Sequence, residues 1–183
     1  MHRCGWVKLT DLTYVAYHDE EWGKPLKDDK ALFELFSLET QAAGLSWLTV
    51  LKKRENYRRA FAYFDLERVA SLDEQAIETI LQTENVIKNR PKLHAIVNNA
   101  KAFQIIIREF GSISAYFWAY VNHTPIYNSI EDYKTAPCTS TISDALTKDL
   151  KKRGFKFVGS TTIYAFMQAC GMVNDHENSC GCK

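Results

Sequence analysis

The sequence predicts an all-α fold. Apolar residues recur at helical spacing through most of the 183 residues, and glycines stand at the ends of several of these periodic segments. No segment alternates apolar and polar residues in the manner of a half-buried strand. Hydrophobic residues make up 46% of the chain. That share is enough for a sizeable core, and the length suits one large domain or two small ones.

The helices follow from periodicity and capping residues. Counting their caps, they are expected at 28–44, 46–64, 71–82, 90–110, 114–121, 143–154 and 160–171. Ser46 is the expected N-cap of the second helix, and Ser71 with Glu74 matches a capping box at the start of the third. Gly111 should end the long fourth helix. The irregular segment 122–141 is too long for an inert connection, so we expect it to be functional and a candidate for DNA contact.

Charge and sequence signals narrow the class of protein. There are 23 basic and 22 acidic residues, giving a net charge of +1, so any surface for nucleic acid must be local. No apolar run is long enough to span a membrane, and the N-terminus does not have the pattern of a signal peptide. We expect a cytoplasmic protein, whose five cysteines are thiols or metal ligands rather than disulfides.

Two glutamates of the 28–44 helix differ in their surroundings. The residues one turn from Glu39 are all apolar, whereas Glu34 neighbours Lys30 and Ser37. We therefore expect Glu39 on the buried face and Glu34 outside it. A buried carboxylate normally has a partner. Glu39 is then either a structural group bonded to a backbone amide or a functional one that binds a cation or acts as an acid or base.

Aromatic residues are concentrated in the first fifty positions. They are Trp6, Tyr14, Tyr17, Trp22 and Trp47. Each one alone is expected in the core, as most aromatic residues are. As a group beside Glu39, they would suit a flat cationic ligand, because ring faces attract a cation with ~0.5–2 kcal/mol per contact.

Both ends of the chain carry possible metal ligands. His176 and Cys180 are four residues apart, so one helical turn could direct both at one ion, with Cys4 and His18 as the complement from the other end. Two cysteines and two histidines make a closed, structural type of zinc site. The spacing matches no zinc-finger pattern, and the alternative is a disordered tail with free thiols. Other residues are available as ligands: His94, His123 and Cys182.

Clustered positive charge lies mainly in residues 51–59 and 149–157, which we interpret as solvated helix faces. Residues 83–92 connect two expected helices. Such a short turn can direct backbone N–H groups at a phosphate, as in a helix-hairpin-helix element, although the usual glycine-rich turn is absent. The basic residues near it, expected to bind DNA, are Lys88, Arg90 and Lys92.

Four stretches carry a resemblance to a known family. They are RCGWV (3–7), YHDEEWG (17–23), LETQAAGLSWLTVLKKRENYRRAF (38–61) and GFKFVGSTTIYAFMQACGMVNDH (154–176). With them, the sequence resembles bacterial 3-methyladenine DNA glycosylase I from end to end, a family of the helix-hairpin-helix glycosylase superfamily. Pro91 departs from the small or polar residue expected in the hairpin, and it removes a backbone donor there.

The resemblance implies a single glycosylase unit over residues 1–183. Its central helical part, at about 65–115, would contain the hairpin, and its N- and C-terminal parts would together form a zinc-bound subdomain. The ligands of one structural zinc ion would be Cys4, His18, His176 and Cys180. Glu39 would contact the lesion base, and the other pocket residues would be Tyr17 beside it, Trp47 stacked on the base, and Trp6, Tyr14 and Trp22.

The implied reaction is excision of 3-methyladenine from double-stranded DNA. The enzyme would flip the damaged nucleotide out and hydrolyse its N-glycosidic bond, as a monofunctional glycosylase without a lyase step. Methylation at N3 leaves the base cationic and already a good leaving group. We therefore expect Glu39 to supply recognition and electrostatic stabilisation rather than to be an obligate general base. A monomer is expected.

The stretch YHDEEWG would then serve two sites at once. Tyr17 and Trp22 would belong to the pocket, while His18 turns to the metal, since adjacent helical residues point about 100° apart. The acidic residues between them, Asp19, Glu20 and Glu21, are expected to be solvated or to cap a helix. Two other functions remain: a zinc-stabilised module that binds DNA or a small cation without catalysis, and a helical interaction protein with an unligated tail.

Overall fold

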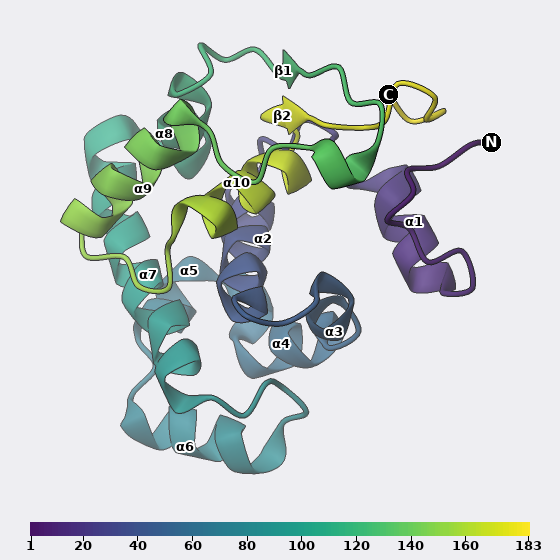
Figure 1. Ribbon diagram of the computed structural model, residues 1–183. Helices are drawn as coiled ribbons and strands as arrows, with labels where there is room; N and C mark the ends of the chain where they lie inside the picture. Colours follow the sequence, from purple (N-terminus) through teal and green to yellow (C-terminus); the bar gives the residue numbers. More distant parts are fainter.

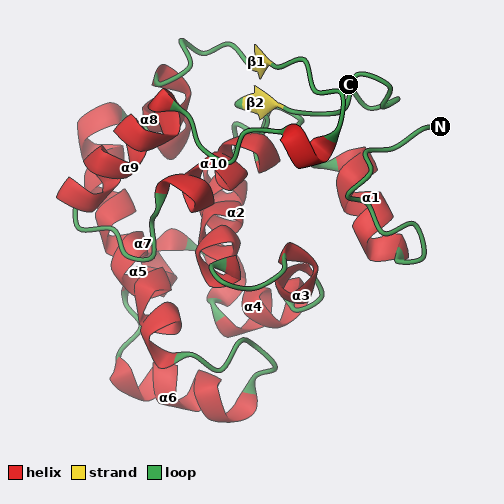
Figure 2. Cartoon of the chain, in the orientation of Figure 1, coloured by secondary structure: helices red, strands yellow, loops and turns green.

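The computed structural model describes residues 1–183 and confirms the mostly helical class (Figures 1 and 2). The helices are α1 (Leu12–Glu20), α2 (Asp29–Ala42), α3 (Trp47–Leu51), α4 (Arg54–Ala60), η1 (Ala62–Phe64), α5 (Leu66–Ala70), α6 (Glu74–Thr83), α7 (Arg90–Phe110), α8 (Ile113–Ala119), η2 (Tyr133–Thr135), α9 (Thr141–Lys152) and α10 (Ser160–Ala169). Two strands, β1 (Ile126–Tyr127) and β2 (Val173–Asn174), complete the fold. No helix is both long and apolar enough to cross a membrane.

Helix α2 is central to the core. It packs against α3, α7, α8 and α10, and Phe36 at its middle is fully buried. The ring of Phe36 lies within 5.8 Å, centroid to centroid, of four other phenylalanines from these helices and the segment before α10. Asp28 caps the start of α2 by accepting a hydrogen bond from Ala31 N, 2.8 Å away. Helix α2 carries Glu39 in its last two turns.

Three of the expected helix boundaries are wrong. The helix expected over 46–64 is divided into α3, α4 and η1, because the chain turns at Lys52–Lys53 and residues 62–64 all take positive φ angles. Ser46 does cap the first piece. The capping box at Ser71 is also wrong: Asp73 caps α6, and the Ser71 hydroxyl donates to Arg68 O at the end of α5. Helix α9 begins at Thr141 rather than at 143, with Ser140 as its cap.

The expectation for Glu34 is wrong as well. Its side chain is buried, with the whole residue 8% exposed. Its carboxylate accepts hydrogen bonds from the guanidinium groups of Arg54, at 2.5 Å, and Arg58, at 2.9 Å. Both arginines belong to α4, so only the tertiary fold brings them to α2 and balances the buried charge.

The two ends of the chain lie side by side (Figure 1). Strand β1 pairs in parallel with β2, and Gly181 N donates to His2 O at 2.9 Å. Two-residue strands give no detectable alternation, which is why the sequence did not predict them. The pairing ties the 122–141 segment to the C-terminal segment, next to α1 and α10.

Candidate functional site

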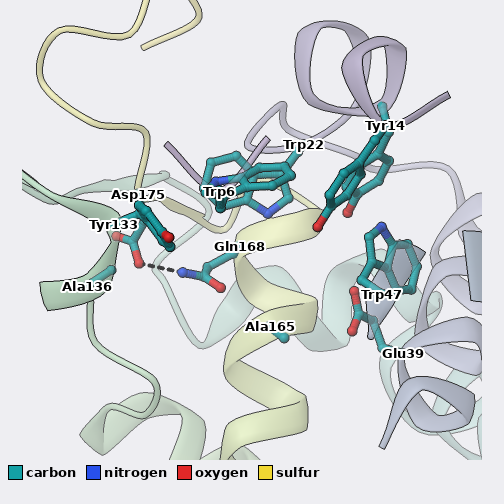
Figure 3. Close-up of a pocket in the computed structure, with 11 residues that line it drawn as sticks. Trp6, Tyr14, Trp22, Glu39, Trp47, Tyr133, Ala136, Ala165, Gln168 and Asp175 are labelled. Carbon is teal, nitrogen blue, oxygen red and sulfur yellow. Dashed lines mark hydrogen bonds between the residues drawn. The ribbon is translucent and has the colours of Figure 1, made fainter. Parts of the chain in front are cut away.

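A cavity of about 230 Å³ opens between α1, α2, α3, α10 and the 122–141 segment (Figure 3). It is lined by Trp6, Tyr14, Tyr17, Trp22, Glu39, Trp47, Tyr133, Ala136, Ala165, Gln168 and Asp175. The six residues expected to form a pocket therefore do lie around one cavity. Five further lining residues were not expected from the sequence.

Glu39 is the first of two polar groups in this cavity that lack a partner. The residue is 7% exposed, and no residue donates a hydrogen bond to its carboxylate or lies close enough to offset its charge. Burial therefore raises the pKa of Glu39 to about 8. The structural alternative, a carboxylate bonded to a backbone amide, is excluded. A cation bound beside Glu39 would restore the charged form.

The aromatic side chains form a box around the approach to Glu39. Trp6 contacts both Tyr14 and Trp22, with ring centroids 5.0 Å apart in each pair. Trp47 begins α3 and lies 5.3 Å from the ring of Tyr17. The indole N–H of Trp47 is buried and has no hydrogen-bond partner. Two unpartnered polar groups in an aromatic cavity indicate a site completed by a ligand.

The other end of the cavity is polar. The side-chain amide of Gln168 donates to Asp175 at 2.8 Å, as Figure 3 shows. Asp175 also accepts from the Tyr164 hydroxyl, at 2.8 Å, and from the Asn128 amide, at 2.7 Å. These bonds fix Gln168 and satisfy the buried Asp175. They join residues remote in sequence, so the pattern alone carried no signal for them beyond the unusual length of the 122–141 segment.

Four metal-ligating side chains meet beside the cavity: Cys4, His18, His176 and Cys180. All four are buried, and their ligand atoms lie within 4.8 Å of one another. The sulfur-to-nitrogen distances are 3.4 Å for Cys4–His176, 3.5 Å for Cys180–His176 and 3.6 Å for Cys180–His18. Sulfur and nitrogen ligands of a tetrahedral zinc ion stand ~3.6 Å apart, so this donor set fits such an ion.

Hydrogen bonds to the second nitrogen of each imidazole orient His18 and His176 for metal binding. His18 Nδ1 donates to Asp19 at 2.8 Å, and Asp19 is itself held by Arg3. His176 Nε2 donates to Trp22 O at 3.1 Å. The other nitrogen of each ring is directed at the cysteines. Asp19 was expected to be solvated or capping, and this support for His18 was missed because neighbours on a helix usually point apart.

The basic residues expected at the hairpin are engaged within the protein. The Lys88 ammonium caps α6 by donating to Leu81 O and Glu84 O, and Arg90 pairs with Glu74 at 3.0 Å and with Glu78. Lys92 is buried, 7% exposed, and donates to the carbonyls that end α2, at Gln41 and Ala43. Their contact with DNA stays a prediction, and Lys92 now has a structural role. Pro91 lies in the first turn of α7, where a missing N–H breaks no helical bond.

Known proteins are similar to this chain in sequence and in fold. A family model described as methyladenine glycosylase matches residues 6–183. DNA-3-methyladenine glycosylase 1 of Escherichia coli is 50% identical over 182 residues, which cover 100% of this chain and 97% of that protein. DNA-3-methyladenine glycosylase of Haemophilus influenzae is 49% identical over 181 residues, covering 99% and 97%.

A solved structure extends the likeness to the fold. It is the crystal structure of a tyrosine-to-phenylalanine variant of 3-methyladenine DNA glycosylase I in complex with 3-methyladenine. It superposes with a TM-score of 0.96 at 41% identity, covering 100% of this chain and 98% of that one.

Proposed function

The chain belongs to the methyladenine glycosylase family, and from that premise we propose that it excises 3-methyladenine from alkylated double-stranded DNA. It is a hydrolase of N-glycosyl bonds, as its named relatives are. The observation that supports this substrate is the state of Glu39. An unpartnered, buried carboxylate in an aromatic cavity is suited to a flat cation.

Selectivity follows from the charge of the lesion. Methylation at N3 makes the adenine of the nucleotide cationic, so it is attracted by the ring faces and by Glu39. Neutral adenine gains little from either and still removes water from the carboxylate. The cation also favours ionisation of Glu39, whose pKa of about 8 in the free protein leaves it mostly protonated near neutral pH.

The enclosed position of Glu39 supports base flipping. Its carboxylate is buried and lies beside the ring of Trp47 (Figure 3), where a base that stays stacked in a duplex cannot reach it. The nucleotide must therefore rotate out of the helix to place its base in the box. The energy for unstacking would come from the new contacts with the aromatic rings.

The chemistry needs little acid catalysis. When the bond between the sugar and the base breaks, the cationic base takes the bonding electrons and leaves as a neutral molecule. Positive charge then passes to the deoxyribose, and water completes the hydrolysis. Glu39 recognises the base and stabilises this charge. No lysine lines the cavity, so no amine is available to form a Schiff base, which supports a monofunctional glycosylase without a lyase step.

Cys4, His18, His176 and Cys180 would hold one zinc ion. The ion would have all four positions filled by protein, so its contribution is to fix the fold rather than to activate water. Through Cys4 and Cys180 it would tie the N-terminal segment to the C-terminal one. Trp6 and Trp22 lie close to His18 and His176, so the same ion would support one wall of the pocket.

Chromatography of the bases released from N-methylated duplex DNA tests this function. The purified protein should release 3-methyladenine, and undamaged DNA treated in parallel should release no base. Binding of methylated DNA without release of any base by the folded, zinc-loaded protein would instead support a non-catalytic binding module. Absence of both zinc and DNA binding would support a plain interaction protein.

A further inference from the structure

Three consecutive residues of the C-terminal segment direct their side chains at three different parts of the molecule. His176 joins the metal-ligand cluster, while Asp175 bonds Gln168 in the cavity. Glu177 is directed toward a third place, the rim of the cavity, and it is also buried, 6% exposed. The first two residues are accounted for by the zinc site and the polar end of the pocket. Glu177 is not.

The carboxylate of Glu177 joins two segments that are remote in sequence. Its Oε2 accepts a hydrogen bond from Gly5 N at 2.9 Å, and its Oε1 accepts one from Tyr133 N at 2.8 Å. Each oxygen of a buried carboxylate therefore has its own backbone donor, and such charge-assisted bonds are among the strong ones in proteins. We refer to Glu177, Gly5 and Tyr133 as the rim clamp.

The two segments pack on each other inside the rim clamp. A Cβ atom on Gly5 would lie 3.0 Å from Cδ1 and Cε1 of the Tyr133 ring. The ring of Tyr133 therefore packs closely on the backbone of Gly5. A Cβ at position 5 would require the Tyr133 ring to shift by a few tenths of an ångström, so glycine favours this close approach, although its φ angle is ordinary.

Both segments held by the rim clamp carry walls of the cavity. Trp6 follows Gly5 and belongs to the aromatic box, and Tyr133 lines the cavity itself with Ala136. Figure 3 shows Tyr133 at the end of the cavity away from Glu39. Tyr133 is 36% exposed whereas Glu39 is 7% exposed, so Tyr133 forms part of the entrance and Glu39 the interior.

We propose that Glu177 is a positioning residue for base binding, which fixes the entrance of the pocket by holding Tyr133 against the segment that carries Trp6. Tyr133 is then a binding residue that packs on the base once it has entered. The inference rests on the proposed excision of 3-methyladenine. Loss of the clamp leaves two backbone N–H groups without partners and lets the 132–136 turn move, so a base must order the turn as it binds.

A double-mutant cycle on binding of free 3-methyladenine tests this inference. Wild type, Glu177→Ala, Tyr133→Ala and the double variant are titrated with the base, using the fluorescence of the pocket tryptophans. Zinc content and thermal midpoint are measured on each sample. Glu177→Gln is included as an isosteric variant, because its amide can accept only one of the two bonds and it serves if the alanine variant does not fold.

The control variant is Glu131→Ala. Glu131 lies in the same loop and also bonds the C-terminal segment, accepting from the Asn178 amide at 2.6 Å. Its side chain does not line the cavity and accepts no hydrogen bond from Gly5 or Tyr133. A general loosening of this loop would be seen in Glu131→Ala, whereas a specific effect of the rim clamp would not.

Glu177→Ala and Tyr133→Ala should each weaken binding roughly three- to tenfold, with smaller loss for Glu177→Gln. The double variant should lose much less than the product of the two, and zinc content should stay at one per chain. On methylated DNA, KM should rise with kcat nearly unchanged. Binding equal to wild type, independent effects of the two substitutions, or weakening that follows loss of zinc would each overturn the inference. A wild type that neither binds nor excises the base would instead count against the proposed function.

Discussion

Tyr17 and His18 are neighbours in helix α1, yet their side chains belong to two different sites. Tyr17 lines the cavity, with its ring 5.3 Å from that of Trp47, while His18 places Nε2 3.6 Å from Cys180 Sγ. Both are buried, which is unusual for adjacent helical residues and requires protein on two sides of the helix. A single turn of α1 therefore links the aromatic pocket to the metal-ligand cluster.

Metal binding can be tested by comparing a variant of one expected ligand, Cys180, with a variant of a nearby cysteine, Cys182. Cys180→Ala should lower zinc content from one per chain to near zero and lower Tm by more than about 10 °C, because a structural zinc contributes folding energy directly. Cys182→Ala should keep its zinc, since Cys182 groups only with His18 and Asp19 and is not one of the four buried residues of the metal-ligand cluster. Elemental analysis and thermal unfolding measure both. Equal zinc loss in the two variants would show that Cys182 also binds the ion.

Trp47 should contribute to base binding through its ring. Trp47→Ala should weaken binding of 3-methyladenine about tenfold or more, because stacking of a base on an aromatic side chain is worth ~1–3 kcal/mol. Trp47→Phe should keep most of the affinity, since a ring face remains. Isothermal titration calorimetry with the free base measures the affinity of each variant. An unaffected Trp47→Ala would mean that the base lies elsewhere in the cavity.

Stability should depend on pH through Glu39. Burial raises its pKa from 4.5 to about 8, so folding favours the protonated form. The stabilisation is fully present below the pKa that Glu39 has in the unfolded chain. It is lost as the pH rises through the pKa that Glu39 has in the folded protein. Glu39→Gln is always neutral, so its stability relative to wild type should increase from about pH 5 to about pH 8, by at most ~4 kcal/mol. Urea unfolding at several pH values measures this difference. A difference that does not vary with pH would contradict the unpartnered state of Glu39.

Arg90 and Lys92 should behave differently although they are two positions apart. The side chain of Arg90 is 50% exposed, so Arg90→Ala should weaken binding to undamaged DNA. The slope of log affinity against log salt concentration should also fall by about one. Lys92 is buried against the end of α2, so Lys92→Ala should lower the stability instead. DNA titrations at several salt concentrations, with unfolding curves, separate the two effects. An equal loss of salt dependence in both variants would place Lys92 on the DNA after all.

Local sequence signals predicted much of the fold. The span of α7, Arg90 to Phe110, followed from its periodicity and from Gly111, which takes a φ of +87° at the end of the helix. Glu39 was expected to be buried because its helical neighbours are apolar, and it is. The same reasoning was wrong for Glu34, since the arginines that balance its charge come from a different helix.

The candidate site likewise has a part that could be predicted from the sequence and a part that could not. Trp6, Trp22 and Trp47 are close to Glu39 in sequence, so their grouping around one cavity could be anticipated. Tyr133 and Glu177 could not, because they meet only after the 122–141 segment pairs with the C-terminal segment. A hydrogen bond between a backbone N–H and a distant carboxylate has no counterpart in the spacing of residues.

Our proposal assigns to Glu39 the recognition of a cationic base in this pocket. It is tested most directly by the rate of 3-methyladenine release from methylated duplex DNA by wild type and by Glu39→Gln, with spontaneous release measured without protein. The substitution keeps the shape of the side chain and removes its negative charge. We predict a rate at least about tenfold slower for Glu39→Gln, equivalent to ~1.4 kcal/mol or more. Equal rates of release from two folded proteins would contradict the claim.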